Sequence, residues 1–479
     1  MGQDHYKNVI IGSGEGGKYL AWHLAQSGQP TVVIERRWIG GSCPNTNCLP
    51  TKNEIWSAKV AHLLRHAREF GVNAAPVSSD MAAVRNRKRE MVKGLIDMHL
   101  SKYKASGAEL MMGEAKFSAP KTLDVRLNQG GTRTLTGERI FLNLGTHPSI
   151  PSVPGLRECS PLTNIEALEL DVLPSHLVVI GGGYVGLEFA QAHRRFGSRV
   201  TILQQGPTLL ANQDADVSDE IHRILSSEGI DVVISTNLIR VDGHSGDEVS
   251  VQTETPAGPN TITATHVLVA TGRIPNTTGI GLDLAGVQLA PGGWVRVNDR
   301  LETTAADIWA IGECAGSPQF THASLDDYRI IRDNLAGGNR STRGRLMPSC
   351  LFTDPQVAQV GLTETEAHNL GISVQVVKAP VSTVLRTRTI SETEGFMKAL
   401  IGADGGILGL TMIGPEAGEV MSVVQMAMQG GLPYTVVRDS VLAHPTMAEG
   451  LNGFFSAVKP AQAGANASSV LDSQLTHQS

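Results

Sequence analysis

The chain is poor in the residues that mark several classes of protein. Only five of its 479 residues are cysteines, and aromatic residues make up 4% of the sequence. An odd number of cysteines, scattered apart from one close pair, does not form the disulfide framework of a small secreted protein. No uninterrupted apolar run reaches the roughly 18 residues of a membrane-spanning helix, and the first residues, MGQDHYKNVIIG, have no charged-then-apolar signal region. We therefore expect a cytoplasmic protein that does not associate with membranes.

A strong excess of charge is also missing. The formal net charge is −6 and the pI is near 6.2, which gives no general attraction to nucleic acid or to anionic lipid. No basic run with interleaved aromatic residues is present, so we expect no nucleic-acid partner. Glycine, in contrast, is abundant at 52 residues, as in a globular protein with many tight turns. The length favours roughly three domains.

One pattern of strand, turn, helix and strand occurs twice. The first copy runs from KNVII at residues 7–11 through GSGEGG to TVVIE, and the second runs from HLVVI at residues 176–180 through GGGYVG to RVTIL. Both copies match Gly-x-Gly-x-x-Gly, at Gly12, Gly14 and Gly17 and at Gly181, Gly183 and Gly186. The first glycine permits a sharp turn, the second lets a pyrophosphate approach the backbone, and the third lets helix and strand pack closely. The glycines could serve turns alone, but the correct context found twice predicts two dinucleotide sites.

The residue 23 positions after the first glycine distinguishes the two sites. An acid there bonds the ribose 2′-hydroxyl, whereas an arginine nearby accommodates a 2′-phosphate. This residue is Glu35 in the first copy and Gln204 in the second. No lysine or arginine lies between Arg199 and Arg223, so nothing local is ready to hold a 2′-phosphate. The second site is predicted to take NADH or NADPH, and the sequence favours NADH.

Two further segments, residues 267–276 and 301–314, are apolar strands that end in glycine turns, which suit backbone contact with a ligand. Residues 350–460 contain alternating apolar runs that predict a mixed sheet with helices on it, and hence a third domain. The last residues are small and polar, which predicts a disordered tail.

The stretch GGSCPNTNCLPTK, residues 40–52, holds the one close cysteine pair, Cys43 and Cys48. A structural disulfide is unusual in an intracellular chain, and a zinc site needs two further Cys or His at ligand spacing, which the neighbouring sequence lacks. Inert thiols and a redox couple remain. A helix is predicted to begin at Cys48, and a helix N-terminus lowers the pKa of a thiol and so raises the thiolate fraction that disulfide exchange needs.

These motifs resemble those of the pyridine nucleotide-disulfide oxidoreductase family, which includes glutathione reductase, dihydrolipoyl dehydrogenase and mercuric reductase. The resemblance covers residues 7–458 and rests on both glycine motifs, GGSCPNTNCLPTK, ATGRIPN, AIGECAG and HPTMAE, in the family's order. The run FTHASLDDYRIIRDNLAGGNR at residues 320–340 resembles the bacterial branch of reactive-chlorine-resistance, copper(II)-reducing flavoproteins. Because this run is expected to lie away from the cysteines, it indicates kinship more than substrate.

The resemblance implies an α/β fold with two Rossmann-like domains, for FAD and for NAD(P), plus a C-terminal α+β dimerisation domain. It divides the chain into an FAD-binding part at residues 1–150, an NAD(P)-binding domain at 151–273, a second FAD-binding, central part at 274–345, a dimerisation domain at 346–459 and a disordered tail at 460–479. It also implies a homodimer whose active sites are shared across the interface.

Catalytic roles follow from the resemblance by position. Cys48 resembles the thiol beside the flavin, and Cys43 resembles the interchange thiol that attacks the acceptor. His444 and Glu449 resemble the acid–base pair that the other subunit donates. A histidine near its ordinary pKa can take the proton from Cys43 and return it to the leaving thiol, while a carboxylate orients the ring.

Lys52 and Glu188 resemble the ion pair beside the flavin ring. Tyr184 resembles the aromatic gate over the nicotinamide pocket, with ordinary packing as the alternative. No metal site is expected. The cofactor-binding residues that the resemblance implies are Gly12, Gly14, Gly17, Glu35, Ser42, Lys52, Ala115, Gly145, Gly312 and Glu313 for FAD, and Gly181, Gly183, Tyr184, Gly186, Gln204 and Gly272 for the nicotinamide cofactor.

The chain departs from the family's pattern at three positions. Asn47 stands where the family usually has glycine, and the turn is expected to survive because Asn tolerates left-handed backbone angles. Glu313 replaces the usual Asp, and Leu144 replaces a usual Thr. The remaining cysteines match no redox position of the family and are expected to be small buried apolar residues: Cys159, Cys314 and Cys350.

The acceptor is the least defined part of the prediction. The vicinal cysteine pair and the amino-terminal metal-binding module that mercuric reductases carry are missing, and nothing marks a lipoyl groove. We expect an FAD-dependent NAD(P)H oxidoreductase that passes electrons through Cys43 and Cys48 to a disulfide or metal-ion acceptor. The alternatives are a low-molecular-weight disulfide or lipoamide reductase, and a flavin-binding redox sensor or scaffold with little turnover.

Overall fold

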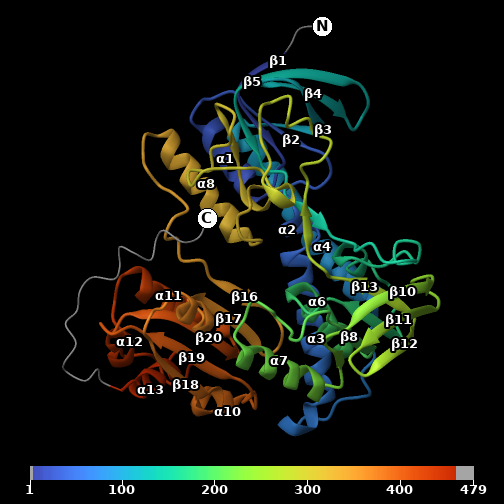
Figure 1. Cartoon of the computed structure of the whole chain (residues 1–479), viewed down its shortest axis with the longest axis vertical. Helices are drawn as coiled ribbons and strands as arrows, with labels where there is room; N and C mark the ends of the chain where they lie inside the picture. Colours follow the sequence, from blue (N-terminus) through green and yellow to red (C-terminus); the bar gives the residue numbers. More distant parts are fainter. Residues whose placement is uncertain (1–3, 460–479) are drawn as a thin grey trace.

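Three sheet regions surround a common centre in the computed structural model, which describes residues 4–459 (Figure 1). The predicted disordered tail at residues 460–479 lies outside the described residues. No helix within the described range is both long and apolar enough to cross a membrane.

The first region opens with a parallel βαβ unit. β1 (Asp4–Ile11), α1 (Glu15–Gln26) and β2 (Thr31–Glu35) follow the predicted order, and β1 pairs with β2 in parallel. The strands are apolar runs because both faces of a parallel sheet are covered. The sheet has the order β1-β2-β3-β4-β5-β15 with a further pairing of β1 and β5, and its other strands are β3 (Glu109–Ala119), β4 (Thr122–Leu127), β5 (Thr132–Leu142) and β15 (Ile308–Ala310).

The second region repeats the unit with β7 (His176–Ile180), α6 (Tyr184–Phe196) and β8 (Arg199–Leu203). Its parallel sheet has the order β13-β7-β8-β9, and an antiparallel sheet of β10, β11 and β12 lies beside it. The remaining elements of this region are α7 (Ala215–Ser227), β9 (Asp231–Val233), β10 (Asn237–Gly243), β11 (Val249–Thr255), β12 (Gly258–Ala264) and β13 (His266–Val269). A small ladder joins β6 (Thr146–Pro148) to β14 (Arg273–Pro275).

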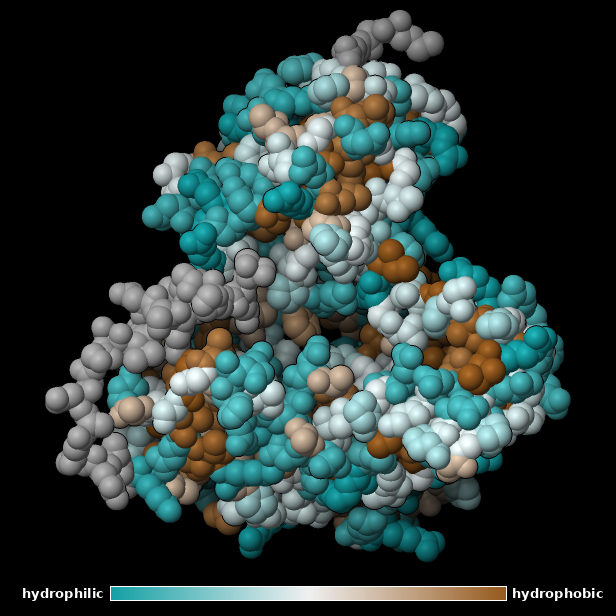
Figure 2. Space-filling model, in the orientation of Figure 1, coloured by the Kyte–Doolittle hydropathy of each residue, from teal (hydrophilic) through white to brown (hydrophobic). Residues whose placement is uncertain are grey.

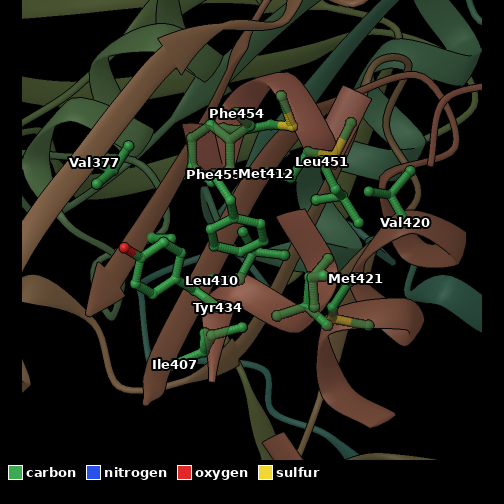
Figure 3. Close-up of a cluster of buried hydrophobic side chains, with 14 of the residues drawn as sticks. Val377, Ile407, Leu410, Met412, Val420, Met421, Tyr434, Leu451, Phe454 and Phe455 are labelled. Carbon is green, nitrogen blue, oxygen red and sulfur yellow. The ribbon is translucent and has the colours of Figure 1, made fainter. Parts of the chain in front are cut away.

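The third region is antiparallel throughout its described strands, so the expectation of a mixed sheet is wrong. Its order is β16-β17-β20-β19-β18, and turns such as residues 402–406 between β19 and β20 reverse the chain. The strands are β16 (Ser349–Leu351), β17 (Gln356–Gly361), β18 (Gln375–Pro380), β19 (Phe396–Ile401) and β20 (Ile407–Gly414). α11 (Ala417–Gln429), α12 (Tyr434–Asp439) and α13 (Gly450–Ser456) supply one side of its core, where Tyr434, Phe454 and Phe455 meet Leu410 and Met412 (Figure 3).

Longer helices join these regions. α3 (Cys48–Arg65) packs along α6 and against α4 (Met81–Ser106), and α8 (Thr321–Leu335) packs on α1. The shorter segments are α2 (Ser42–Asn45), α5 (Asn164–Ala167), α9 (Glu364–Asn369), α10 (Leu385–Thr389), η1 (Ala67–Phe70), η2 (Pro291–Gly293), η3 (Gly312–Ala315) and η4 (Val381–Thr383). Two parallel βαβ regions followed by an antiparallel α+β region confirm the predicted fold class.

Candidate active site

The first glycine loop leaves no room for side chains. Gly12 has φ +99°, and a Cβ on it would lie 2.2 Å from the carbonyl oxygen of Asn143. A Cβ on Gly17 would lie 2.6 Å from the Gly12 carbonyl oxygen, so glycine is needed for the close packing of α1 on β1. The loop that carries the cysteines covers the same turn, because a Cβ on Gly41 would lie 2.6 Å from Gly14 Cα.

Glu35 ends β2 beside this loop and accepts four hydrogen bonds from its own chain. Its Oε2 accepts from the Ser13 N–H at 2.9 Å and the Ser13 hydroxyl at 2.7 Å, and its Oε1 accepts from the N–H groups of Arg37 at 2.8 Å and Trp38 at 3.0 Å. The Ser13 hydroxyl has a second acceptor at the Trp38 carbonyl, 3.1 Å away. It can therefore turn from Glu35 and leave one carboxylate position for a ribose hydroxyl.

The second glycine loop has the same turn but an open middle. Gly181 has φ +114°, and a Cβ on it would lie 2.4 Å from the Ala270 carbonyl oxygen. A Cβ on Gly186 would lie 2.0 Å from the Gly181 carbonyl oxygen. At Gly183, within the described residues, no neighbouring heavy atom lies within 4 Å of an added Cβ. The backbone of Gly183 is thus free to be approached by a ligand.

A cavity of about 1560 Å³ connects this loop to the cysteine pair. Gly181, Gly183 and Tyr184 line one part of it, and Cys43 and Cys48 line another. Figure 2 shows a recess at the centre of one face, where the three regions meet. One open space therefore reaches from the predicted nucleotide loop to the predicted redox pair.

Gln204 lies at the nucleotide end of the cavity. Its side-chain oxygen accepts from the Gly182 N–H at 2.9 Å, and its neighbours Gln205 and Asn237 are also uncharged amides that line the cavity. Among the described lining residues, the lysine and arginine side chains are Lys52 and Arg273, and each is paired with a carboxylate. Among the described residues, no unpaired lysine or arginine side chain therefore lines the end of the cavity at Gln204.

The cysteine pair is present as free thiols, half-buried at the wall of the cavity. α3 begins at Cys48, as predicted. The hydrogen bond from Cys43 lowers the pKa of Cys48 to about 6, while the bond to Cys48 and burial raise the pKa of Cys43. The two thiols are therefore different in kind: Cys48 is a thiolate near neutral pH, and Cys43 keeps its proton.

Thr321 contacts the redox pair, and sequence reasoning missed it. Its hydroxyl lies 3.2 Å from Cys48 Sγ and, after the hydrogen bond from Cys43, also lowers the pKa of Cys48. The expectation that residues 320–340 lie away from the cysteines is therefore wrong. α8 begins at Thr321, and its start is aimed at the start of α3. The available signal was a threonine shortly after the glycine turn of AIGECAG, at the position where α8 begins.

Lys52 and Glu188 form the ion pair that the resemblance implies. Lys52 Nζ lies 2.9 and 2.7 Å from the two oxygens of Glu188, whose side chain is 5% exposed. Glu188 also accepts from the N–H of Phe352 at 2.9 Å, and Lys52 lies over the Phe352 ring at 4.8 Å. The pair joins α3 to α6 and places a fixed cation one helical turn from Cys48.

Tyr184 begins α6 inside the cavity, with its hydroxyl 3.2 Å from Ser349 Oγ and its ring 6.3 Å from that of Phe320. Cys350 follows Ser349 and lines the same cavity. Cys350 is only partly buried, so the prediction that it is buried is wrong for this residue, because β16 is an edge strand that borders the cavity. Cys159 and Cys314 are fully buried, as predicted.

Glu313 lines the cavity, and its longer side chain is held by neighbours. Its carboxylate accepts from the Thr146 hydroxyl and lies 3.5 Å from Arg273 Nε. The extra methylene relative to aspartate is thus accommodated by a fixed position against β6 and β14.

The other predicted cofactor residues are distributed around these groups. Gly312 has φ +71°, and its N–H donates to buried Asp327 at 2.7 Å. Gly145 and Gly272 follow β5 and β13 with positive φ, and Gly272 lines the cavity. Ser42 begins α2, directly after Gly41. The remaining predicted residue is buried in β3 and is not among the described residues that line the cavity: Ala115.

His444 and Glu449 are together but away from the thiols. His444 Nδ1 lies 2.8 and 2.9 Å from the two Glu449 oxygens, and the His444 side chain is 62% exposed. Neither residue is among the described residues that line the cavity with Cys43. Within residues 4–459 no group of three His, Cys, Asp or Glu side chains is arranged to hold a metal ion.

The turn at Asn47 differs from its prediction. Asn47 has φ −128° and ψ −104°, so it does not adopt the left-handed angles that were expected to make Asn a substitute for glycine. Its side-chain oxygen instead accepts from Asn164 Nδ2 at 2.7 Å. A side-chain contact, rather than backbone tolerance, fixes this turn.

A family model described as pyridine nucleotide-disulphide oxidoreductase matches residues 6–327, and the dimerisation domain of that family matches residues 347–453. The chain belongs to this family and is an oxidoreductase, which confirms the predicted resemblance. It is 35% identical to the probable pyridine nucleotide-disulfide oxidoreductase RclA of Escherichia coli strain K12, over 95% of this chain and 99% of that protein. It is 32% identical to the mercuric reductase of Bacillus cereus, over 94% of this chain and 71% of that protein.

A solved structure described as the Cu(II) complex of HOCl-induced flavoprotein disulfide reductase RclA from Escherichia coli is similar throughout. Its TM-score is 0.87 at 34% identity, and the match covers 96% of this chain and 100% of that chain. The site fits the flavin and the pyridine nucleotide that the family implies. The first loop offers bare glycine backbone and the Glu35 carboxylate, and the second offers Gly183 at an open cavity.

Proposed function

We propose that the chain passes electrons from a reduced nicotinamide, by way of FAD, to the Cys43 and Cys48 pair and then to a disulfide or metal-ion acceptor. The observation that carries this proposal is the single cavity lined by Gly183, Tyr184, Cys48 and Cys43. FAD would be held by Gly12, Gly14 and Glu35, and it would supply two-electron exchange between the nicotinamide and the thiols.

The residues of the chain have distinct parts in this reaction. Transfer of a hydride equivalent to the Cys43–Cys48 disulfide breaks the S–S bond and leaves the Cys43 thiol and the Cys48 thiolate. Thr321 and Lys52 stabilise that thiolate. With an acceptor disulfide, Cys43 loses its proton to a base and attacks one sulfur, releasing a thiolate that takes the proton back. Cys48 then attacks Cys43, releases the second acceptor sulfur as a thiolate that takes its proton from solvent, and re-forms the internal disulfide. With a metal-ion acceptor, re-forming the disulfide gives up two electrons and one proton.

We assign the base to His444, oriented by Glu449, of a second subunit. The support is that the pair is exposed and outside the cavity of its own chain, while residues 347–453 match a dimerisation domain. Mixing inactive Cys43→Ser and His444→Ala subunits is expected to give hybrid dimers with one intact site, and so about a quarter of the wild-type activity after random reassociation. No recovery on mixing would contradict the assignment.

We further propose that the nucleotide is NADH. The uncharged amides around Gln204 suit a ribose hydroxyl better than a 2′-phosphate, and the described cations of the cavity are already paired. The ratio kcat/KM is expected to favour NADH over NADPH by about tenfold or more, because a buried phosphate would lack a partner. Gln204→Arg should reduce that preference. Equal efficiencies in the wild type would contradict the proposal.

The central experiment is an anaerobic titration of the flavin-loaded protein with NADH while its visible spectrum is recorded. A long-wavelength band, from the Cys48 thiolate against the flavin, is expected to grow after two electrons and before the flavin absorbance falls. Cys43→Ser should lose disulfide and metal-ion reduction but keep quinone reduction. Loss of flavin absorbance without the band would contradict the dithiol route.

The alternative of a redox sensor or scaffold predicts no spectral change with either nucleotide. A low-molecular-weight disulfide or lipoamide reductase differs only in the acceptor, so a panel of disulfides and metal ions assayed with Cys43→Ser as the control separates these functions. The Cu(II) bound by RclA and the mercury named for the Bacillus relative make metal ions the first acceptors to test.

A further inference from the structure

Asn47 occupies the N-cap position of α3 but does not cap the helix. An Asn at this position normally accepts a hydrogen bond from an N–H in the first turn. Within the described residues, no side chain caps α3, and the third position of its first turn is Pro50, which has no N–H. The free N–H groups and the positive end of the α3 dipole therefore remain at Cys48, the first helical residue.

The carboxamide of Asn47 is held away from the helix by Asn164. Asn164 Nδ2 donates to Asn47 Oδ1 at 2.7 Å and to the carbonyl oxygen of Thr46 at 2.7 Å. Asn164 is 6% exposed and is the first residue of α5, which precedes the second βαβ unit. One buried amide thus fixes two consecutive residues, Thr46 and Asn47, of the segment between Cys43 and Cys48, which we call the redox loop.

This diversion matters because an oxygen acceptor at the end of α3 would compete with the Cys48 sulfur for the same positive end. The groups that face Cys48 from the surrounding elements are Cys43 from α2, Lys52 from α3, Glu188 from α6 and Thr321 from α8. Glu188 is neutralised by Lys52. Together with Lys52, the helix end and the donors Cys43 and Thr321 favour the charged form of the thiol.

We propose that Asn164 is a positioning residue that acts through its bond to Asn47: it keeps the Asn47 carboxamide from capping α3, so that the N-terminus of the helix stays directed at Cys48 and holds Cys48 as the thiolate partner of the redox couple. The proposal rests on the dithiol function proposed above. The bond replaces the glycine turn that the resemblance led us to expect at residue 47, and it ties the redox loop to the segment that leads into the nucleotide region.

The test uses the flavin-loaded protein in a Cys43→Ser background, so that Cys48 is the one thiol of the pair and its hydrogen-bond donor is kept as a hydroxyl. Two quantities are recorded against pH: the long-wavelength absorbance, and the rate at which iodoacetamide alkylates Cys48, followed by mass spectrometry. Asn164→Ala frees the Asn47 carboxamide to cap α3 and is expected to raise the apparent pKa of Cys48 by about half to one unit. Asn47→Gly removes the competing oxygen, so alone it should leave this pKa near that of the parent, and added to Asn164→Ala it should abolish the rise.

Glu166→Ala is the matched control. It removes the capping box of α5, in which Glu166 accepts from the Thr163 N–H and hydroxyl, but leaves the Asn47–Asn164 bond in place. It is expected to lower thermal stability without moving either pH profile. An unchanged profile in Asn164→Ala, or an equal shift in Glu166→Ala, would overturn the proposal. A parent protein with neither the absorbance band nor a thiolate-dependent alkylation rate would instead show that the dithiol function itself is wrong.

Discussion

The two glycine loops share one sequence pattern but lie in different surroundings. The first is enclosed: Asn143 fills the space beside Gly12, Gly41 covers Gly14, and Glu35 is bonded to its own loop. The second opens at Gly183 onto the large cavity. An enclosed loop suits a group that stays bound through many turnovers, whereas an open loop suits a group that must enter and leave each time. The difference shows that the Gly-x-Gly-x-x-Gly motif defines the shape of the backbone, whereas the surrounding residues determine how readily a bound ligand dissociates.

The enclosed loop is expected to be the more fragile of the two. Gly12→Ala would place a Cβ 2.2 Å from the Asn143 carbonyl oxygen at φ +99°, where both the backbone angle and the contact are unfavourable. We expect a loss of more than about 3 kcal/mol of stability and recovery of little flavin-loaded protein. The measurements are the flavin-to-protein absorbance ratio after purification and the midpoint of thermal unfolding.

Gly28→Ala is the matched control for this change. Gly28 follows α1 in the same βαβ unit with φ +75°, but within the described residues no heavy atom lies within 4 Å of an added Cβ. It should cost only about 1 kcal/mol, from the backbone angle alone, and should keep the flavin. If both variants lose flavin equally, crowding at Asn143 is not what makes the first loop special.

The first and second regions are joined where α3 packs on α6. A buried pair of titratable side chains at this contact should make the stability of the protein depend on pH. Glu54 is 3% exposed, its Oε1 lies 3.8 Å from His193 Nε2, and burial raises the pKa of Glu54 to about 8. A carboxyl whose folded pKa lies above its unfolded value binds the extra proton in the folded state. The contribution of the protonated Glu54 carboxyl to the free energy of unfolding is present in full below the unfolded pKa and is lost as the pH rises through about 8.

Glu54→Gln stays neutral and should therefore be more stable than the wild type at high pH. We expect its advantage in urea unfolding to grow by about 1–3 kcal/mol between pH 6 and pH 9. Glu90→Gln, at an exposed position of α4, is the control and should show no such growth. A constant difference between Glu54→Gln and wild type across this range would mean that Glu54 is ionised throughout.

Patterns within short stretches of sequence predicted most of the secondary structure around the two glycine loops. The strands and helices of both βαβ units follow from periodicity and glycine spacing, and α3 begins at Cys48 as expected. Lys52 and Glu188 are 136 residues apart in the sequence, and they were matched through the family's motifs rather than through any pattern in the residues themselves.

Contacts between distant segments were not predictable in this way. Thr321 meets Cys48 across 273 residues, and Asn164 meets Asn47 across 117, because α8 and α5 are brought to the redox loop only when the regions assemble. The direction of strands in the third region and the incomplete burial of Cys350 on its edge strand also depend on assembly. A single sequence carries no periodic signal for any of these.

A methyl group added to the open loop at Gly183 should change the stability of the protein little but should weaken nucleotide binding. At Gly183, φ −92° and ψ −175° are ordinary for alanine, and the space around an added Cβ is free within the described structure, so Gly183→Ala should lower stability by only about 0.5–1 kcal/mol, the difference between glycine and alanine at the N-cap of α6. The same methyl group would stand where the pyrophosphate must approach the backbone, so KM for NADH is expected to rise by about tenfold while the flavin content stays unchanged. Gly94→Ala, in the open on α4, controls for the change of residue type and should leave KM unchanged. An unchanged KM in Gly183→Ala would place the nucleotide elsewhere in the cavity. Tyr184 and the cavity wall, rather than the glycines, would then be what allows the nucleotide to exchange.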